Sequence, residues 1–269
     1  MHRNQLRPLF FLGNKRSGTS HLVRLLNLHP RIFVTHEADI VWILYQLWSG
    51  KTPQAYPWDG GRGMEVTLDV CKDVFEMNAK NIVEGRGIPD VFFQVARVIM
   101  KNGSKYQKPY DKPDLAWIGD KKPVQQADPQ VRQFIYSYFP EARFIHIIRH
   151  PQAVVGSMVE AAKEWARVDY WKSSPMEILR RWAIHEEWVL TAKSEGYPIY
   201  SIRFEDLCDK PAEILDSIFG FLDQNMFSEI ADMAIKGTHS DPNRKYSSFV
   251  LPACPEANRV MDIYGYKRL

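Results

Sequence analysis

The sequence of 269 residues contains only three cysteines and no long apolar segment. Cys71, Cys208 and Cys254 lie far apart and show neither disulfide-framework nor metal-ligand spacing, so we expect a reduced protein. No apolar run approaches the roughly 20 residues that a membrane-spanning helix needs. The leading PLFFLG is too short for the core of a signal peptide. These absences predict a cytoplasmic protein with no membrane span.

Neither sign of charge is in large excess, because the formal net charge is only +3 at pH 7. This value argues against a nucleic-acid partner, although it allows a local basic cleft for a small anionic ligand. The sequence shows no internal repeat, low-complexity tract or Pro/Gly-rich linker that would divide the chain. We therefore expect a single domain over residues 1–269. The sequence does not indicate an oligomeric state.

Short apolar segments alternate with helix-compatible segments along the chain. The apolar segments are residues 9–12, 31–36, 115–120, 142–149 and 199–205. This alternation predicts an α/β fold with three layers, in which a central, mostly parallel sheet of about five strands is flanked by helices. A mainly helical insertion spans about residues 38–112, and insertions beyond the carboxyl ends of sheet strands usually build substrate pockets.

The segment GNKRSGTS, residues 13–20, lacks one residue of a nucleotide-binding motif. A P-loop reads G-x-x-x-x-G-K-[ST], and here Gly13, Gly18 and Ser20 have that spacing while Thr19 replaces the lysine. Loop amides and the following helix N-terminus can still bind a phosphate without the lysine. We therefore expect the loop to bind a 5′-phosphate and the group attached to it. A glycine-rich turn with incidental charges is the alternative.

The string KRSGTS, followed by LVRLLNLHP and then a glutamate, resembles the 5′-phosphosulfate loop of the PAPS-dependent sulfotransferases, in the branch whose loop reads RSGT. The resemblance implies a P-loop NTPase-like fold, PAPS (3′-phosphoadenosine 5′-phosphosulfate) as donor, 3′,5′-ADP as product, and sulfuryl transfer without a metal. It also implies that Arg16 neutralises charge on the leaving phosphate oxygen. The implied donor contacts come from Lys15, Arg16, Ser17, Gly18, Thr19 and Ser20.

A second segment, FIHIIRHPQAVVGS at 144–157, resembles the 3′-phosphate signature of the same family. An arginine fork suits a phosphate monoester and a serine hydroxyl can donate one more hydrogen bond, which makes Arg149 and Ser157 the candidates. A strand-end surface arginine and a small helix-packing serine are the alternatives. The later basic segment NRKY implies two further contacts to the 3′-phosphate, from Arg244 and Lys245.

Two weaker similarities accompany these motifs. DKKP lies where the family often has a lysine near the donor, so Lys121 or Lys122 is a candidate, with a solvated turn as the alternative. IRFEDL resembles a late strand in which the family usually has a tyrosine. Phe204 replaces that tyrosine, so a hydroxyl contact is not expected there.

Sulfuryl transfer requires a base that removes a proton from the acceptor. Glu37 follows the second expected strand and matches the glutamate that serves as base in the RSGT branch. Its neighbour His36 is the alternative base, because an unperturbed imidazole titrates near neutrality. A carboxylate that starts the next helix is the structural alternative for Glu37. We expect His146 to be a satisfied core residue and His185 to be partly exposed.

Aromatic residues suggest the acceptor side of the reaction. The insertion contains Trp42, Tyr45, Trp48, Tyr56 and Trp58, and a later segment contains Trp165, Tyr170 and Trp171. Any one of them is by default a core residue. As a group they predict a pocket for a small-molecule or glycan acceptor, ring-bearing or apolar, with a hydroxyl or amine that receives the sulfuryl group.

Two other functions compete with this prediction. LAWIGD is an apolar strand ending in Asp120, which is typical of the Mg²⁺-binding carboxylate of a P-loop kinase or NTPase. The missing loop lysine argues against that class. The other possibility is a catalytically silent nucleotide-binding protein that keeps the fold and the phosphate sites.

Overall fold

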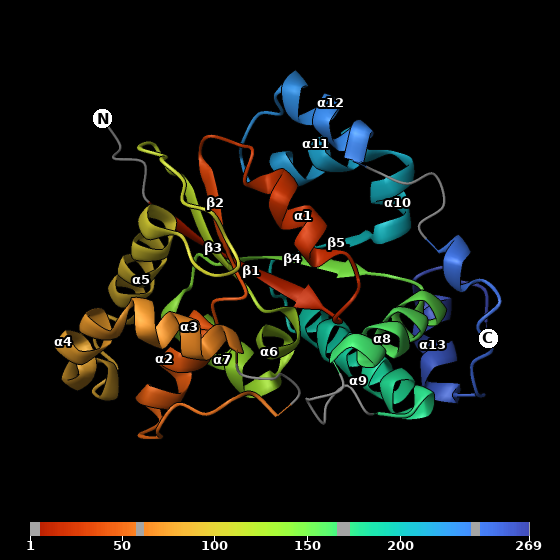
Figure 1. Cartoon of the computed structure of the whole chain (residues 1–269), viewed down its shortest axis with the longest axis horizontal. Coiled ribbons are helices and arrows are strands. Elements are labelled where there is room, and N and C mark those ends of the chain that lie inside the picture. Colours follow the sequence, from red (N-terminus) through yellow and green to blue (C-terminus); the bar gives the residue numbers. More distant parts are fainter. Residues whose placement is uncertain (1–5, 58–61, 166–172, 238–242, 269) are drawn as a thin grey trace. The chain divides into compact units, whose positions relative to one another are not determined.

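The computed structural model describes residues 6–57, 62–165, 173–237 and 243–268. The strands are β1 (Arg7–Gly13), β2 (Ile32–His36), β3 (Trp117–Lys121), β4 (Arg143–Ile148) and β5 (Ile199–Arg203). They form one parallel sheet in the order β2-β3-β1-β4-β5, flanked by helices (Figure 1). The α/β fold class and the five expected strands are therefore confirmed.

The chain divides into two compact units, which we describe separately. The first comprises residues 1–11 and 20–144, and the second comprises residues 12–19 and 145–269. The expectation of a single domain stays a prediction. Among the helices in the described ranges, none combines the length and apolar character that a membrane crossing requires.

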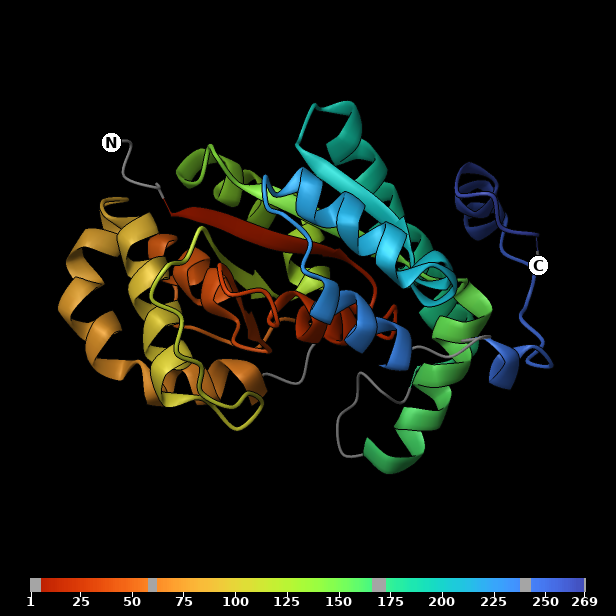
Figure 2. The same cartoon turned by 90° about the horizontal axis from the view of Figure 1, so that it is seen from above.

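The first unit places several helices around β2, β3 and the start of β1. These helices are α1 (Thr19–Leu26), α2 (Ile40–Trp48), α3 (Arg62–Val70), α4 (Lys72–Val83), α5 (Ile88–Asn102), α6 (Pro123–Ala127) and α7 (Pro129–Tyr138). Both β1 and β2 run parallel to β3. Helices α4 and α5 lie side by side in Figure 1 and in Figure 2, where they are gold. Helices α2 to α5 thus occupy most of the 38–112 insertion.

A cluster of phenylalanines forms part of the core of this unit. The ring of Phe10 on β1 lies 5.5 Å from that of Phe92 on α5, 5.4 Å from that of Phe139 and 5.8 Å from that of Phe144, measured between centroids. Tilted and edge-on pairs at such separations add to the free energy of apolar burial. The cluster therefore holds β1 and α5 together.

Strand β2 lies at the edge of the sheet, and two side-chain amides form hydrogen bonds with its backbone. Asn27 accepts a hydrogen bond from Val34 N at 2.7 Å and donates one to Val34 O at 2.9 Å. Gln107 donates to Val34 O at 2.8 Å and accepts from His36 N at 3.1 Å. An edge strand otherwise presents unpaired backbone groups. These amides hold the end of β2 that leads into Glu37.

Lys112 joins the end of α1 to the segment that enters β3. Its side chain is buried, and the ammonium donates to the carbonyl oxygens of Asn27 at 2.7 Å, His29 at 2.8 Å and Ile32 at 2.6 Å. A lysine suits the C-terminal end of a helix because it neutralises the partial negative charge of the last carbonyls. The buried charge is thus fully hydrogen-bonded to backbone.

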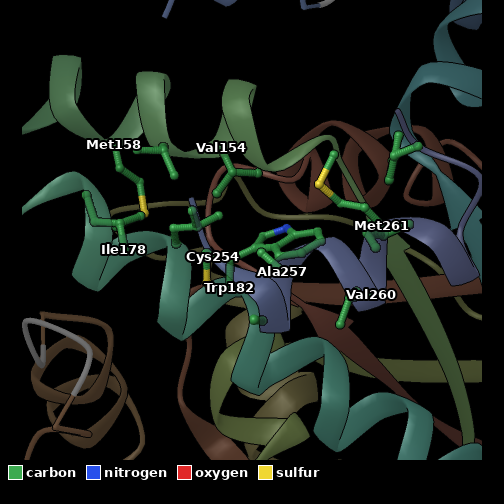
Figure 3. Packing of buried hydrophobic residues seen from close by; sticks show 13 residues of the cluster. Val154, Met158, Ile178, Trp182, Cys254, Ala257, Val260 and Met261 are labelled. Atoms are coloured by element: carbon green, nitrogen blue, oxygen red, sulfur yellow. The ribbon is translucent and has the colours of Figure 1, made fainter. Parts of the chain in front are cut away.

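The second unit contains the remaining helices. They are α8 (Pro151–Trp165), α9 (Pro175–Ser194), α10 (Phe204–Asp209), α11 (Pro211–Phe221), α12 (Ser228–Gly237), the 3-10 helix η2 (Arg244–Tyr246) and α13 (Pro255–Ile263). Figure 3 shows Trp182 of α9 packed between Val154 of α8 and Ala257 of α13. The Trp182 indole also donates a hydrogen bond to Arg149 O at 3.3 Å. The core thereby anchors the backbone that follows β4.

Replacing Lys112 with methionine should lower the free energy of unfolding by about 1.5–3 kcal/mol, since a charged donor to three carbonyls is lost. Urea unfolding followed by circular dichroism measures the change. Lys101→Met, at an exposed position on α5, is the matched control and should change the free energy by at most about 0.5 kcal/mol. Equal stability of both variants would contradict the role assigned to Lys112.

Candidate functional site

The loop between β1 and α1 follows a backbone path that requires glycine at two positions. Gly13 has φ 131° and Gly18 has φ 94°. A Cβ atom at Gly13 would lie 2.4 Å from Ile147 O, and one at Gly18 would lie 2.2 Å from Cδ2 of Phe204. Neither approach is sterically allowed. The two glycines thus permit the loop to lie directly against β4 and Phe204.

The loop supplies several groups that suit an anion. Helix α1 begins at Thr19, so its N-terminal amides and positive dipole end adjoin the loop. Ser17 is completely buried, and its hydroxyl has no hydrogen-bond partner within the described part of the chain. Thr19 is buried, Lys15 is half-buried and Arg16 is exposed. An unpaired buried hydroxyl beside helix amides fits a bound phosphate.

The second unit brings the two predicted phosphate motifs together. Arg16 Nε donates to Ser157 Oγ at 2.9 Å, and Arg149 Nη1 donates to Arg16 O at 3.1 Å. The Arg149 guanidinium lies 4.8 Å from the centroid of the Phe204 ring. Phe204 therefore packs against both Gly18 and Arg149, so the ring that replaces the usual tyrosine has a packing role.

Sequence reasoning missed two residues that hold Arg149. Asn243 Oδ1 accepts from Arg149 Nε at 3.0 Å, and Asn243 Nδ2 donates to Glu205 Oε1 at 2.6 Å. Glu205 also accepts from His150 N at 2.9 Å and from the Tyr266 hydroxyl at 2.7 Å. Glu205 belongs to the IRFEDL string, which was a usable signal. Asn243 is the first residue of the NRKY segment, from which only Arg244 and Lys245 were predicted to bind the donor.

Arg244 and Lys245 are both exposed. The Lys245 ammonium bonds to Glu160 of α8 at 2.7 Å, and the Tyr246 hydroxyl donates to the same carboxylate at 2.9 Å. A Cβ atom at Gly156 would lie 2.5 Å from Cδ1 of Tyr246. These contacts attach η2 to α8. The phosphate-binding role of Arg244 and Lys245 stays a prediction.

In the first unit, charged side chains meet beyond the ends of β2 and β3. Glu37 forms ion pairs with Lys121 and, at 3.0 Å, with Lys122, which also pairs with Asp39 at 3.1 Å. Lys121 further donates to Ser20 Oγ at 3.3 Å. Because Ser20 is the last residue of the GNKRSGTS motif, Glu37 lies one side chain away from the end of that motif. Lys121 and Lys122 are both buried rather than solvated.

The backbone at Glu37 is in the left-handed region. Glu37 has φ 59° and Asp39 has φ 56°. A Cβ atom at Gly63, which follows the start of α3, would lie 2.1 Å from Glu37 O. Left-handed non-glycine residues cost free energy and cluster at functional sites. The close approach of α3 is one contact that maintains this conformation.

Charge and burial set the protonation states of the two candidate bases. Burial alone would raise the pKa of the Glu37 carboxyl, but the Lys121 and Lys122 ammonium groups outweigh it and hold this pKa well below its usual range. Burial and the Lys121 charge lower the pKa of His36 to about 4. His36 Nε2 lies 3.0 Å from Ser20 Oγ. At neutral pH Glu37 is therefore ionised and His36 is neutral.

Asp120 is completely buried, and its carboxylate oxygens are bonded within the protein. They accept from Thr35 Oγ1 at 2.8 Å, from Val41 N at 3.3 Å and from Gln126 Nε2 at 3.3 Å. Burial raises the pKa of this carboxyl. The carboxylate joins β2, α2 and α6 to β3. This engagement argues against Asp120 as the Mg²⁺ ligand of a P-loop NTPase.

Two further histidines, His146 and His185, lie in the interior of the second unit. His146 is fully buried and satisfied, as predicted. His185 is only 1% exposed, so the prediction of partial exposure is wrong. Its ring lies on the inner face of α9, where Nδ1 is 2.7 Å from Asn14 Oδ1. Burial, together with Arg181 and Lys15, lowers the pKa of His185 to about 3.

The aromatic residues of the insertion pack largely on one another. The rings of Trp42 and Tyr56 lie 5.0 Å apart, and those of Tyr45 and Trp48 lie 5.7 Å and 5.4 Å from Phe134 of α7. Trp58, Tyr170, Trp171 and the Trp165 side chain lie outside the described residues. The described aromatic residues thus have a structural use, and the acceptor pocket stays a prediction.

Comparisons with known proteins agree with the fold. A family model described as "Sulfotransferase family" matches residues 8–229. The sulfotransferase domain from the curacin biosynthetic pathway matches with a TM-score of 0.62 and 19% identity, covering 98% of this chain and 99% of its own. The sulfotransferase domain of the Synechococcus PCC 7002 olefin synthase matches with a TM-score of 0.65 and 17% identity, covering 98% of this chain and 95% of its own. A sulfotransferase from Alicyclobacillus acidocaldarius matches with a TM-score of 0.55 and 15% identity, covering 97% of each chain. No curated protein sequence matches the chain.

Gly18→Ala should destabilise the protein because the new methyl group meets the Phe204 ring. Gly196→Ala is the matched control, since Gly196 also has positive φ, 84°, but has nothing within 4 Å of the position of a Cβ atom. Both variants incur the backbone cost of about 1 kcal/mol, and overpacking should add about 1–3 kcal/mol at Gly18 alone. Equal losses in chemical unfolding would contradict the close packing of Phe204 on the loop.

Proposed function

Because the chain belongs to the sulfotransferase family, we propose that it transfers the sulfuryl group of PAPS to a hydroxyl or amine of a small-molecule or glycan acceptor. The observation that most supports this function is the joining of two anion-binding motifs by Arg16, Ser157 and Arg149. A donor with a 5′-phosphosulfate and a 3′-phosphate requires two such motifs. An NTP bears phosphates at the 5′ position alone.

The 5′-phosphosulfate is held by the loop. Amides at the start of α1, the buried Ser17 hydroxyl and the backbone beside Gly18 supply neutral donors. Arg16 and Lys15 supply positive charge, while Thr19 and Ser20 complete the motif. Preorganised donors of this kind stabilise charge that develops on a leaving oxygen. In this proposal Arg16 performs that task.

The 3′-phosphate is held by Arg149 and Ser157. Asn243 and Glu205 orient the Arg149 guanidinium through hydrogen bonds, and Phe204 covers it. A guanidinium restrained in this way has little conformational entropy to lose when it binds a phosphate. Arg244 and Lys245, exposed at the surface, add positive charge at longer range.

In the transfer itself, PAPS supplies an activated sulfuryl group. The bond between sulfur and the bridging phosphate oxygen breaks, a bond forms between sulfur and the acceptor oxygen or nitrogen, and 3′,5′-ADP leaves with the electron pair. Arg16 offsets the charge on the leaving oxygen. Glu37 takes the proton from the acceptor. No step in this scheme requires a metal.

Glu37 is the preferred base even though its pKa is low. The acceptor proton becomes strongly acidic as the new bond to sulfur forms, so a weak base is sufficient late in the transfer. Lys121 links Glu37 to Ser20 and holds the carboxylate ionised. His36 is neutral at the same pH and remains the alternative base. An acceptor that binds beside α3 is consistent with either residue.

Competing functions have less support. A kinase or NTPase would need its loop lysine and a free carboxylate at Asp120, which is instead bonded to Thr35 and Gln126. A silent nucleotide-binding protein would have no need for the strained backbone at Glu37. The cytoplasmic location belongs to the same proposal and is supported by three buried cysteines that form no disulfide with one another.

Arg149→Ala tests the 3′-phosphate assignment. It should weaken 3′,5′-ADP binding by about 10- to 100-fold, as expected for a charge-assisted hydrogen bond of roughly 1.5–3 kcal/mol, and change 5′-AMP binding far less. Calorimetric titration measures both affinities. Arg259→Ala removes an exposed arginine that pairs with Glu187 and should change neither. An equal loss for the two ligands would remove Arg149 from the 3′-phosphate site.

Glu37→Gln tests the base without knowledge of the acceptor. With water as acceptor, the conversion of ³⁵S-labelled PAPS to sulfate and 3′,5′-ADP should slow by about 10²-fold or more, while 3′,5′-ADP affinity stays within about threefold. Glu65→Gln, at an exposed position on α3, should keep the wild-type rate. Full activity of Glu37→Gln together with loss of activity in His36→Gln would make His36 the base.

A further inference from the structure

A chain of buried hydrogen bonds in the second unit begins at the loop of residues 13–20, which we call the phosphate loop. Asn14, the second residue of the loop, donates from Nδ2 to Glu186 Oε1 at 2.8 Å and to Trp182 O at 3.3 Å. The other carboxylate oxygen of Glu186 lies 2.8 Å from His146 Nε2, and His146 Nδ1 lies 2.8 Å from Ser201 Oγ on β5. Glu186 and His146 are both completely buried.

The chemistry of these groups fixes the direction of each bond near the loop. Glu186 and Trp182 O are acceptors, so the amide nitrogen of Asn14 must face them. The amide oxygen of Asn14 then faces His185, whose Nδ1 must carry the hydrogen. The Asn14 side chain is thus held between a buried carboxylate and a buried imidazole. Only a residue with one donor side and one acceptor side satisfies both.

None of these groups belongs to the phosphate-binding set or to the candidate bases. A buried carboxylate is costly unless its partners compensate for the loss of hydration. Here one partner is the loop itself, through Asn14, and the other is His146. The network therefore restrains the Asn14 side chain, one residue after Gly13.

We propose that Glu186, with His146 behind it, is a positioning residue that sets the conformation of the phosphate loop through Asn14. This inference rests on the proposed function only in that the loop binds a 5′-phosphate. Asn14→Asp would place a carboxylate against Glu186 and Trp182 O. Adding Glu186→Gln exchanges donor and acceptor, because the introduced glutamine amide can donate to the new carboxylate and accept from His146.

The test is a charge-exchange cycle with calorimetric titration of 3′,5′-ADP. Asn14→Asp should weaken binding by at least about tenfold, as expected for coupled neighbours, and the double variant with Glu186→Gln should recover most of the loss. Asn14→Asp with Glu187→Gln is the control, since Glu187 is the next residue of α9, is partly exposed and pairs with Arg259. Direct repulsion of the nucleotide by the introduced carboxylate would persist in both double variants.

Hydrogen exchange of the residue 13–20 amides in the ligand-free protein gives a second readout. Faster exchange in Asn14→Asp that is reversed by Glu186→Gln, and not by Glu187→Gln, supports the inference. This holds even if the wild-type protein binds no nucleotide. The absence of nucleotide binding would refute the proposed function and not this inference. If Asn14→Asp does not fold, the inference is supported equally when the double variant with Glu186→Gln folds and the double variant with Glu187→Gln does not. Equal behaviour of the two double variants would overturn the inference.

Discussion

The close approach of the phosphate loop to its neighbours is the constraint on which the second unit depends. A side chain fits at neither Gly13 nor Gly18, because Ile147 O and the Phe204 ring occupy the space. This contact lets Phe204 cover the Arg149 guanidinium as well. It also lets Arg149 bond to the backbone of Arg16. A loop with a wider path would separate the two phosphate motifs that the proposed donor requires.

The first unit buries two lysine side chains, and their charges need carboxylate partners. Lys121 and Lys122 share Glu37 and Asp39, so each buried ammonium has a partner. The left-handed backbone at Glu37 costs free energy, and contacts with α3 and with the edge of β2 maintain it. The outcome is an ionised carboxylate one side chain from Ser20. In the proposed function, such preorganisation would reduce the rearrangement that accompanies binding of the donor and acceptor.

Much of this organisation was predictable because it has a local sequence signal. The five strands follow from short apolar runs, and the loop follows from the glycine spacing at Gly13 and Gly18. Arg149 and Ser157 were candidates because residues 144–157 resemble a family signature, and the structure brings both to Arg16. Phe204 was noticed only as a missing tyrosine, because its packing on Gly18 depends on a contact between distant segments.

The unpredicted features are those that depend on long-range partners. The pattern around His185 reads as an exposed helix face, since Glu186, His185 and Trp188 are polar or amphipathic. The side chain is buried because Asn14 and the loop cover that face. Asn243 likewise owes its role to Arg149 and Glu205, which are far away in sequence. The ion pairs that lower the pKa of Glu37 could not be predicted without knowing that Lys121 ends the strand beside β2.

The most direct test of the central claim is which nucleotide stabilises the protein against heat. A ligand at about 100 times its dissociation constant stabilises the native state by roughly 2.7 kcal/mol, which raises the melting temperature measurably. The proposed function predicts stabilisation by 3′,5′-ADP that is unchanged by EDTA. Stabilisation by ATP with Mg²⁺ alone, abolished by EDTA, would contradict it and would favour phosphoryl transfer at this loop.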